Sequence, residues 1–224
     1  MNKTNNKFDT RRLVGMAMFA ALAYAVTFVF RIPVLFLTFD AKDAVITIAS
    51  LIYGPLAGIS ISFTVALIEA ISISGTGIYG FIMNFASSAT FSAVAALIYK
   101  YKRNTTGAII SFYAASISMV SVMMLLNFFV TPYYMMGPNL AIEESRAAVV
   151  GMIPTLILPF NIAKALLNSA IAMMLYKPVT VAMRRAKLLD GKGSMSVNRS
   201  SIAVYISALV TLAAAITIFV ILKK

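Results

Sequence analysis

Long apolar runs separated by short polar segments organise this sequence. The runs at residues 13–30, 78–99, 107–130 and 152–177 each approach or exceed the 20 or so residues that a helix needs to cross a bilayer. The apolar stretch at 44–74 is too long for one crossing and is broken at Tyr53-Gly54-Pro55, which predicts two short helices joined by a tight turn. The pattern therefore predicts an all-α polytopic membrane protein with a six-helix bundle.

A further apolar run, at residues 205–222, follows a basic segment and is a candidate seventh transmembrane helix. We therefore divide the chain into a polar N-terminal segment (1–12), a six-span membrane domain (13–183), a basic linker (184–200) and an extra apolar C-terminal segment (201–224).

One apolar run carries polar residues where a membrane helix should have none. Asn161, Lys164 and Asn168 are spaced i, i+3, i+7, so on a helix they form a single polar stripe. A charged side chain at membrane depth costs at least about 2.5–3.5 kcal/mol. The stripe is therefore expected to face protein, water or a ligand.

Composition supports the membrane assignment and narrows the chemistry. Hydrophobic residues make up 61% of the chain and charged residues 12%, about half the charged share of a soluble domain. The chain has no Cys and no His, which excludes disulfides, thiol or Ser-His catalysis and His-based metal sites, and it has no Walker A loop. We predict no enzyme activity, no catalytic residue, no metal and no bound cofactor.

The positive charge is unevenly distributed among the loops. The 19 Lys and Arg outnumber the 7 Asp and Glu, and they cluster before the first run, between 99 and 107, and after 177. Cytoplasmic loops collect such residues, so we expect a cytoplasmic N-terminus and external loops at 31–43, 74–80 and 131–150. Because this rule accounts for the basic excess, we expect the partner surface to be the lipid bilayer and not nucleic acid.

With this orientation, polar residues from separate spans fall in the outer half of the membrane. They are Glu69, Asn84, Asn127 and Asn161, with Lys164 nearer the middle and Asp40 and Asp43 on the loop above. One interpretation is that they pair with one another to hold the bundle together, for example as a Glu69–Lys164 ion pair. The other is an outward-facing pocket for a neutral, flat solute with many hydrogen-bonding groups.

Specific segments resemble a known family. Phe39-Asp40-Ala41-Lys42-Asp43 leads into Ile52-Tyr53-Gly54-Pro55-Leu56-Ala57-Gly58, and Asn127 precedes Thr131-Pro132-Tyr133. A fourth segment is Pro159-Phe160-Asn161-Ile162-Ala163-Lys164. With these segments and an alanine-repeat first helix, residues 10–185 resemble the riboflavin-specific substrate-binding subunits (S components) of energy-coupling factor vitamin importers.

The resemblance implies riboflavin held near the external surface of a plasma-membrane protein, under the first loop. It implies docking, through small residues of the first helix, on a membrane-embedded T component that carries two ABC-type ATPases. The residues expected to dock are Ala17, Ala21 and Ala25. The resemblance also implies ligand contact by Asn127, Asn161 and Lys164, with the loop at 38–43, which includes Thr38, Phe39, Asp40 and Asp43, as a lid. Their depth in the membrane adds Glu69, Thr76 and Asn84 to the expected ligand contacts, and Tyr133 and Asn168 complete the set.

One departure and two alternatives stay open at this stage. The family fold ends near residue 185, so the run at 205–222 is an addition that, if it spans, brings the C-terminus outside. The pocket could serve another heterocyclic vitamin, such as thiamin. The chain could also be a stand-alone proton-coupled secondary transporter using Glu69 or Lys164, although no internal inverted repeat is visible.

Overall fold

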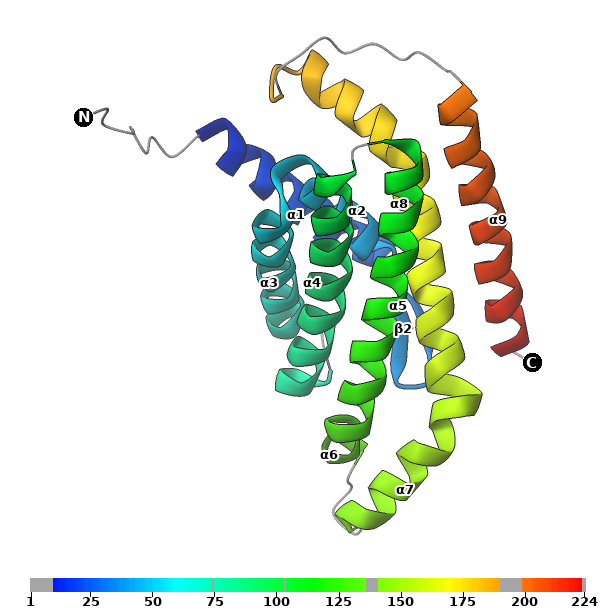
Figure 1. Ribbon diagram of the computed structural model, residues 1–224. Helices are drawn as coiled ribbons and strands as arrows, with labels where there is room; N and C mark the ends of the chain where they lie inside the picture. Colours follow the sequence, from blue (N-terminus) through cyan, green and yellow to red (C-terminus); the bar gives the residue numbers. More distant parts are fainter. Residues whose placement is uncertain (1–9, 74, 103, 136–140, 190–198, 223–224) are drawn as a thin grey trace.

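The computed structural model describes residues 10–73, 75–102, 104–135, 141–189 and 199–222. These residues form a helical bundle with one small hairpin (Figure 1). In chain order the elements are α1 (Thr10–Val29), β1 (Ile32–Val34), β2 (Leu37–Phe39), α2 (Lys42–Tyr53), α3 (Pro55–Ser72), α4 (Gly77–Tyr101), α5 (Thr105–Phe129), α6 (Thr131–Met135), α7 (Ile142–Met152), the π-helical turn η1 (Ile153–Ile157), α8 (Leu158–Arg185) and α9 (Arg199–Leu222).

The predicted all-α membrane architecture is confirmed. Within the described ranges, six helical stretches are long and apolar enough to cross a membrane: α1, α3, α4, α5, the continuous stretch Ile142–Arg185, and α9. The stretch at 44–74 divides as predicted into α2 and α3, but α2 has only 12 residues, fewer than a crossing needs. It is surrounded by the other helices, and nine of its residues are buried.

Gly54 makes the sharp turn between α2 and α3. Its φ of 97° lies in the left-handed region, which glycine adopts without the steric penalty that a Cβ brings. Pro55 follows as the first residue of α3, where the missing N–H costs no hydrogen bond. The Gly-Pro pair thus ends one helix and starts the next, as the sequence predicted.

The first external loop is more regular than the sequence indicated. β1 and β2 form an antiparallel hairpin in which Ile32 pairs with Phe39 and Val34 with Leu37. The turn residue Leu35 has a φ of 52°, an unusual conformation for a residue with a side chain. The sequence analysis predicted a loop at 31–43 and missed the two strands.

The helix that carries the polar stripe starts before the predicted boundary. The helical path begins at Ile142 as α7 and passes through η1 into α8, which continues beyond Pro178 to Arg185. Asn161, Lys164 and Asn168 all lie on α8 and are 2%, 5% and 1% exposed. The predicted stripe therefore faces protein and not lipid.

The additional C-terminal run is helix α9, which lies alongside α8 (Figure 1). Its buried positions are Ala208, Thr211 and Ala215, which form one stripe toward α8 and α5. The hydroxyl of Tyr113 on α5 lies 2.7 Å from Thr211 Oγ1. Most of the predicted linker, residues 190–198, lies outside the described residues, as do residues 1–9 of the predicted N-terminal segment.

Candidate functional site

A cavity lies between the hairpin and the surrounding helices, at the hairpin end of the bundle. Its walls come from α1, the hairpin, α2, α3, α4, α5, α6 and α8, so it is a feature of the whole bundle. Eight of the residues predicted from the sequence line it: Thr38, Asp40, Glu69, Thr76, Asn84, Asn127, Asn161 and Lys164. The predicted convergence of polar groups from separate spans is thus seen in the structure.

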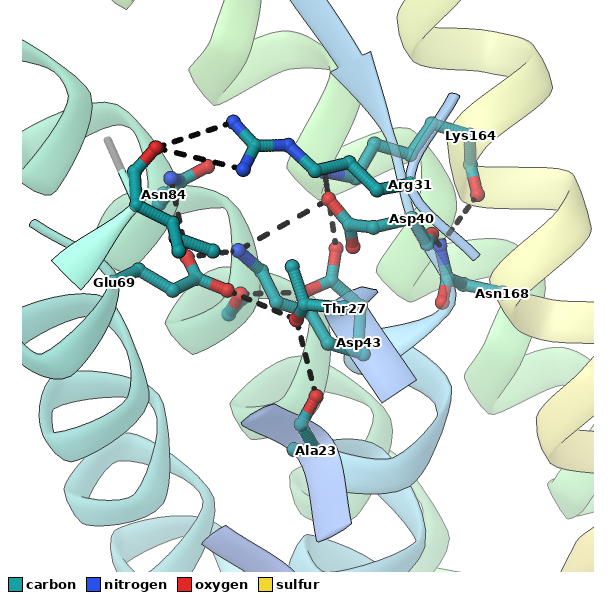
Figure 2. A network of polar contacts seen from close by, with 12 residues as sticks. Ala23, Thr27, Arg31, Asp40, Asp43, Glu69, Asn84, Lys164 and Asn168 are labelled. Atoms are coloured by element: carbon teal, nitrogen blue, oxygen red, sulfur yellow. Dashed lines mark hydrogen bonds and ion pairs between the residues drawn. The ribbon is translucent and has the colours of Figure 1, made fainter. Parts of the chain in front are cut away.

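Two buried ion pairs cross this cavity wall (Figure 2). Lys164 Nζ of α8 lies 2.9 Å from Asp40 Oδ2, at the end of the hairpin. Lys42 Nζ of α2 lies 2.5 Å from Glu69 Oε2 of α3. The Glu69–Lys164 pair considered from the sequence is therefore replaced by two other pairs, because Lys42 is the lysine that reaches Glu69.

Further polar side chains hold the acidic partners in position. Thr27 Oγ1 of α1 donates to Glu69 Oε1 at 3.1 Å, and Asn84 Nδ2 of α4 lies 3.3 Å from Glu69 Oε2. Ser88 donates to Asp43, which is also 3.9 Å from Lys164 Nζ. Glu69 thus receives hydrogen bonds from three different helices, and it connects α1, α2 and α4 through one carboxylate.

Asn168 supports the site from one helical turn further along α8. Its Oδ1 accepts from the backbone N–H of Ala44 at 2.8 Å, and its Nδ2 donates to the carbonyl of Asp40 at 3.1 Å. One amide therefore satisfies two backbone groups between the hairpin and α2. This fixes the backbone on which Asp40 and Lys42 sit.

The cluster holds more acidic than basic groups. Asp40, Asp43 and Glu69 are opposed by Lys42 and Lys164, and all five are at most 5% exposed. Burial alone would raise the pKa of the Asp40 carboxyl, but the ammonium groups of Lys164 and Lys42 outweigh it and hold that pKa below its usual value. Asp40 Oδ1 and Asp43 Oδ2 are buried and have no hydrogen-bond partner among the described residues.

The two amides on α5 and α8 face the cavity with hydrogen-bonding capacity to spare. Asn127 Nδ2 donates to the carbonyl of Met123 at 2.8 Å, and Asn161 Nδ2 donates to the carbonyl of Ile157 at 2.8 Å. Each of these bonds runs back one turn along the same helix and uses one of the two amide hydrogens. Among the described residues, no partner is seen for the second hydrogen of either amide, and Asn127 Oδ1 accepts from Thr131 Oγ1 at 2.9 Å.

Four predicted residues do not line the cavity. Phe39 packs on Phe160 and turns away from the interior, Asp43 and Asn168 lie behind the lining, and Tyr133 is 49% exposed while its neighbour Tyr134 lines the wall. Asp43 and Asn168 still touch the lining residues Lys164 and Asp40. The backbone N–H of Tyr133 donates to the carbonyl of the lining residue Val130 at 3.2 Å, but its side chain is half exposed.

Sequence analysis missed several lining residues, among them Thr27, Arg31, Phe36 and Lys42. Thr27 lies four residues after the buried Ala23, on the face of α1 that packs against the bundle. The i, i+4 spacing could have indicated from the sequence that Thr27 faces the interior. The sequence analysis placed Lys42 in the external loop at 31–43, whereas it is buried in the structure. The helix start at Lys42 turns it inward.

The alanine repeat lies on the opposite face of α1. Gly15, Phe19, Ala23 and Thr27 are buried against the bundle, whereas Ala17, Ala21 and Ala25 are exposed. Ala17, Ala21 and Ala25 are therefore not packed against the bundle that the described residues form.

The fold and the site together define a multi-pass membrane protein built around a cavity that is lined by charged, amide and apolar side chains. The family model for the substrate-specific component of the energy-coupling factor transporter matches residues 11–176. The chain belongs to this family of transporter components.

Related proteins and a solved structure agree with this assignment. The chain is 34% identical over 184 residues to the riboflavin transporter RibU of Staphylococcus aureus, covering 80% of this chain and 96% of that one. It is 28% identical over 176 residues to the riboflavin transporter FmnP of Bacillus subtilis, covering 74% and 90%. A solved structure of the S component of a bacterial energy-coupling factor transporter superposes with a TM-score of 0.64 at 32% identity, covering 79% of this chain and 99% of that one.

Proposed function

We propose that this chain captures riboflavin in the cavity beneath the hairpin and delivers it across the membrane with a T component and two ABC-type ATPase subunits. The observation that carries the proposal is the convergence of Asn127, Asn161 and Lys164 on one cavity from two helices. The two riboflavin transporters that the chain resembles over most of their length support the choice of ligand.

The chemistry of these groups suits the proposed ligand. Riboflavin combines a flat tricyclic ring, whose edge carries carbonyl oxygens, ring nitrogens and one N–H, with a chain of hydroxyl groups. Asn127 and Asn161 supply amide donors, and Lys164 supplies a charged donor, which makes the stronger hydrogen bond. The aromatic side chains of Tyr79 and Phe160 line the same cavity and can cover a flat ring.

The remaining site residues have different proposed roles, some in contact with the ligand and some behind the lining. Thr38, Thr76 and Asn84 line the cavity and are proposed as further ligand contacts. Asp40 and Glu69 hold the two lysines, while Asp43 and Asn168 position the hairpin end behind the lining. Phe39 fastens the hairpin that closes the cavity, and Tyr133 is left without a ligand role.

We further propose that the cavity opens outward and that the N-terminus is cytoplasmic in a bacterial-type plasma membrane. The charge distribution supports this orientation. Arg12 and Lys100 lie around a hollow next to Tyr53, and α8 ends with Arg184 and Arg185, all away from the hairpin end. In this orientation α9 starts on the cytoplasmic side and ends on the external side (Figure 1).

The exposed alanines are proposed as the docking face for the T component. Small residues let two membrane helices approach closely, and Ala17, Ala21 and Ala25 lie on one exposed face of α1. α9 packs on α5 and α8. The additional helix therefore leaves the proposed docking face uncovered.

The deciding experiment is ligand binding by the purified full-length chain. The chain from cells, solubilised in detergent, is expected to be yellow with a flavin absorption spectrum. After removal of the ligand it should quench riboflavin fluorescence on titration, and excess thiamin should not compete. Quenching that is absent at every riboflavin concentration, or competition by thiamin, would overturn the assignment to riboflavin.

A further inference from the structure

We propose that α9 is a brace for the hairpin: its Phe219 holds Phe39 against the cavity wall and thereby slows the release of the ligand. This inference rests on the proposed function and adds a residue that determines how long the ligand stays bound. α9 begins at Arg199, after the matched family region ends at residue 176, so the brace is an addition to the common fold.

The brace starts with a firm attachment of α9 to the bundle. Ala208, Thr211 and Ala215 are at most 2% exposed and repeat at i, i+3, i+7, so small side chains let α9 approach the bundle closely. The hydroxyl of Tyr113 on α5 contacts Thr211 Oγ1 at 2.7 Å and Ser207 Oγ at 3.4 Å. Polar contacts of this kind fix the rotation of α9 about its axis.

The same helix face continues into large apolar residues next to the hairpin. Ile218, Phe219 and Leu222 pack against the small cluster formed by Phe39, Phe160 and Ala163. The ring of Phe219 lies 5.2 Å from the ring of Phe39, centroid to centroid. The attachment in the middle of α9 therefore positions Phe219 against Phe39 of β2.

Phe39 contacts two rings. The ring of Phe160, a cavity-lining residue of α8, lies 5.6 Å away and nearly perpendicular, and the ring of Phe219 lies 5.2 Å away at a tilt of 49°. The next residue, Asp40, is bonded to Lys164. Movement of the hairpin away from the cavity has to separate Phe39 from both rings, so the contact with Phe219 adds to the barrier for release.

The test is a double-mutant cycle on the full-length chain with Phe39→Ala, Phe219→Ala and both together. Protein loaded with labelled riboflavin is mixed with excess unlabelled riboflavin, and the loss of label gives the dissociation rate. Losing one aromatic pair corresponds to about a two- to tenfold change. We expect Phe219→Ala to speed dissociation by this factor in the wild-type background and to have no further effect beside Phe39→Ala.

Two further variants separate a brace from a general loss of stability. Ile221→Ala removes a residue that is 66% exposed two positions away and should leave the dissociation rate unchanged. Phe219→Leu keeps apolar bulk, should dissociate at a rate between those of wild type and Phe219→Ala, and carries the test if the alanine variant fails to fold.

If Phe219→Ala releases riboflavin at the wild-type rate, the brace is overturned. If only Phe219→Leu folds, a wild-type rate in that variant overturns it. Riboflavin binding by the wild-type chain would still uphold the proposed function. An equal effect of Phe219→Ala in the presence and absence of Phe39 would also overturn the brace, because the effect would not pass through the hairpin. Failure of the wild-type chain to bind riboflavin at all would instead overturn the proposed function.

Discussion

Lys42 and Glu69 form a buried ion pair that joins α2 to α3, with 2.5 Å between Nζ and Oε2 and only 2% of each residue exposed. The second carboxylate oxygen of Glu69 accepts a hydrogen bond from Thr27 on α1. Because α1 also presents the exposed alanines on its other face, this carboxylate connects the cavity wall with the proposed docking helix.

Removing one member of this pair should destabilise the fold strongly. Lys42→Met leaves the Glu69 carboxylate buried without its counter-charge, and breaking such a pair typically costs about 3–5 kcal/mol. The double variant Lys42→Met/Glu69→Leu removes both charges and should recover most of this loss. The measurement is the melting temperature of the purified chain without ligand, with the exposed Lys100→Met as the control. If the Lys42→Met variant has the melting temperature of the wild type, the ion pair contributes little to the stability of the fold.

The alanine face should govern assembly without affecting the ligand. Ala21→Leu places a branched side chain where two helices are proposed to meet closely, so we expect the ATPase module to be lost from co-purification while riboflavin affinity stays unchanged. Ala214→Leu makes the same change at an exposed position of α9 and should preserve assembly. Loss of assembly in both variants, or loss of riboflavin binding in Ala21→Leu, would contradict the proposed docking face.

The sequence predicted the membrane helices well because polar backbone cannot be exposed to lipid, and an apolar run of about 20 residues meets this constraint as a helix. It also predicted that Asn127, Asn161 and Lys164 would meet, since their order along the spans fixes their depth. Depth does not fix which helices are lateral neighbours. For this reason the sequence could offer a Glu69–Lys164 pair only as one possibility, and the structure pairs Glu69 with Lys42.

The hairpin and its contact with α9 could not be predicted from the sequence, for a different reason. Strands of three residues are too short to show an alternating pattern, so the segment looked like an apolar loop. Its turn therefore gave no indication that Phe36 lines the cavity while Phe39 turns away. The contact between Phe39 and Phe219 joins positions 180 residues apart, as 219 minus 39 gives, and no local pattern encodes it.

The hairpin should control the lifetime of the complex. Phe36→Ala removes apolar cover from the cavity without touching the helical polar groups. Full burial of a phenylalanine is worth about 1.5–3 kcal/mol, so we expect dissociation of riboflavin to accelerate by at least about tenfold, since affinity changes at one site appear mainly in the off-rate. The control is Leu35→Ala, at the neighbouring turn residue that is 79% exposed. Equal dissociation rates for Phe36→Ala and wild type would mean that the hairpin does not cover the ligand.

The polar stripe of α8 supports a last prediction, which separates ligand contact from structural pairing. Asn161 bonds only its own helix, to the carbonyl of Ile157, among the interactions described. Asn161→Leu should therefore leave the melting temperature close to wild type. It should raise the Kd for riboflavin by about ten- to a hundredfold, because an unpaired polar group of a bound ligand costs about 1–3 kcal/mol.

Lys164 is expected to behave differently, because it serves both the ligand and the hairpin. Lys164→Met removes the charged donor and also leaves Asp40 buried without its partner 2.9 Å away, so affinity and melting temperature should both fall. Asp40→Asn/Lys164→Met removes the stranded charge and should recover melting temperature without recovering affinity. Each variant is measured twice, by quenching of riboflavin fluorescence and by melting without ligand. Recovery of affinity in the double variant would show that Lys164 acts on the ligand only by holding the hairpin, and normal affinity in Asn161→Leu would remove that amide from the site.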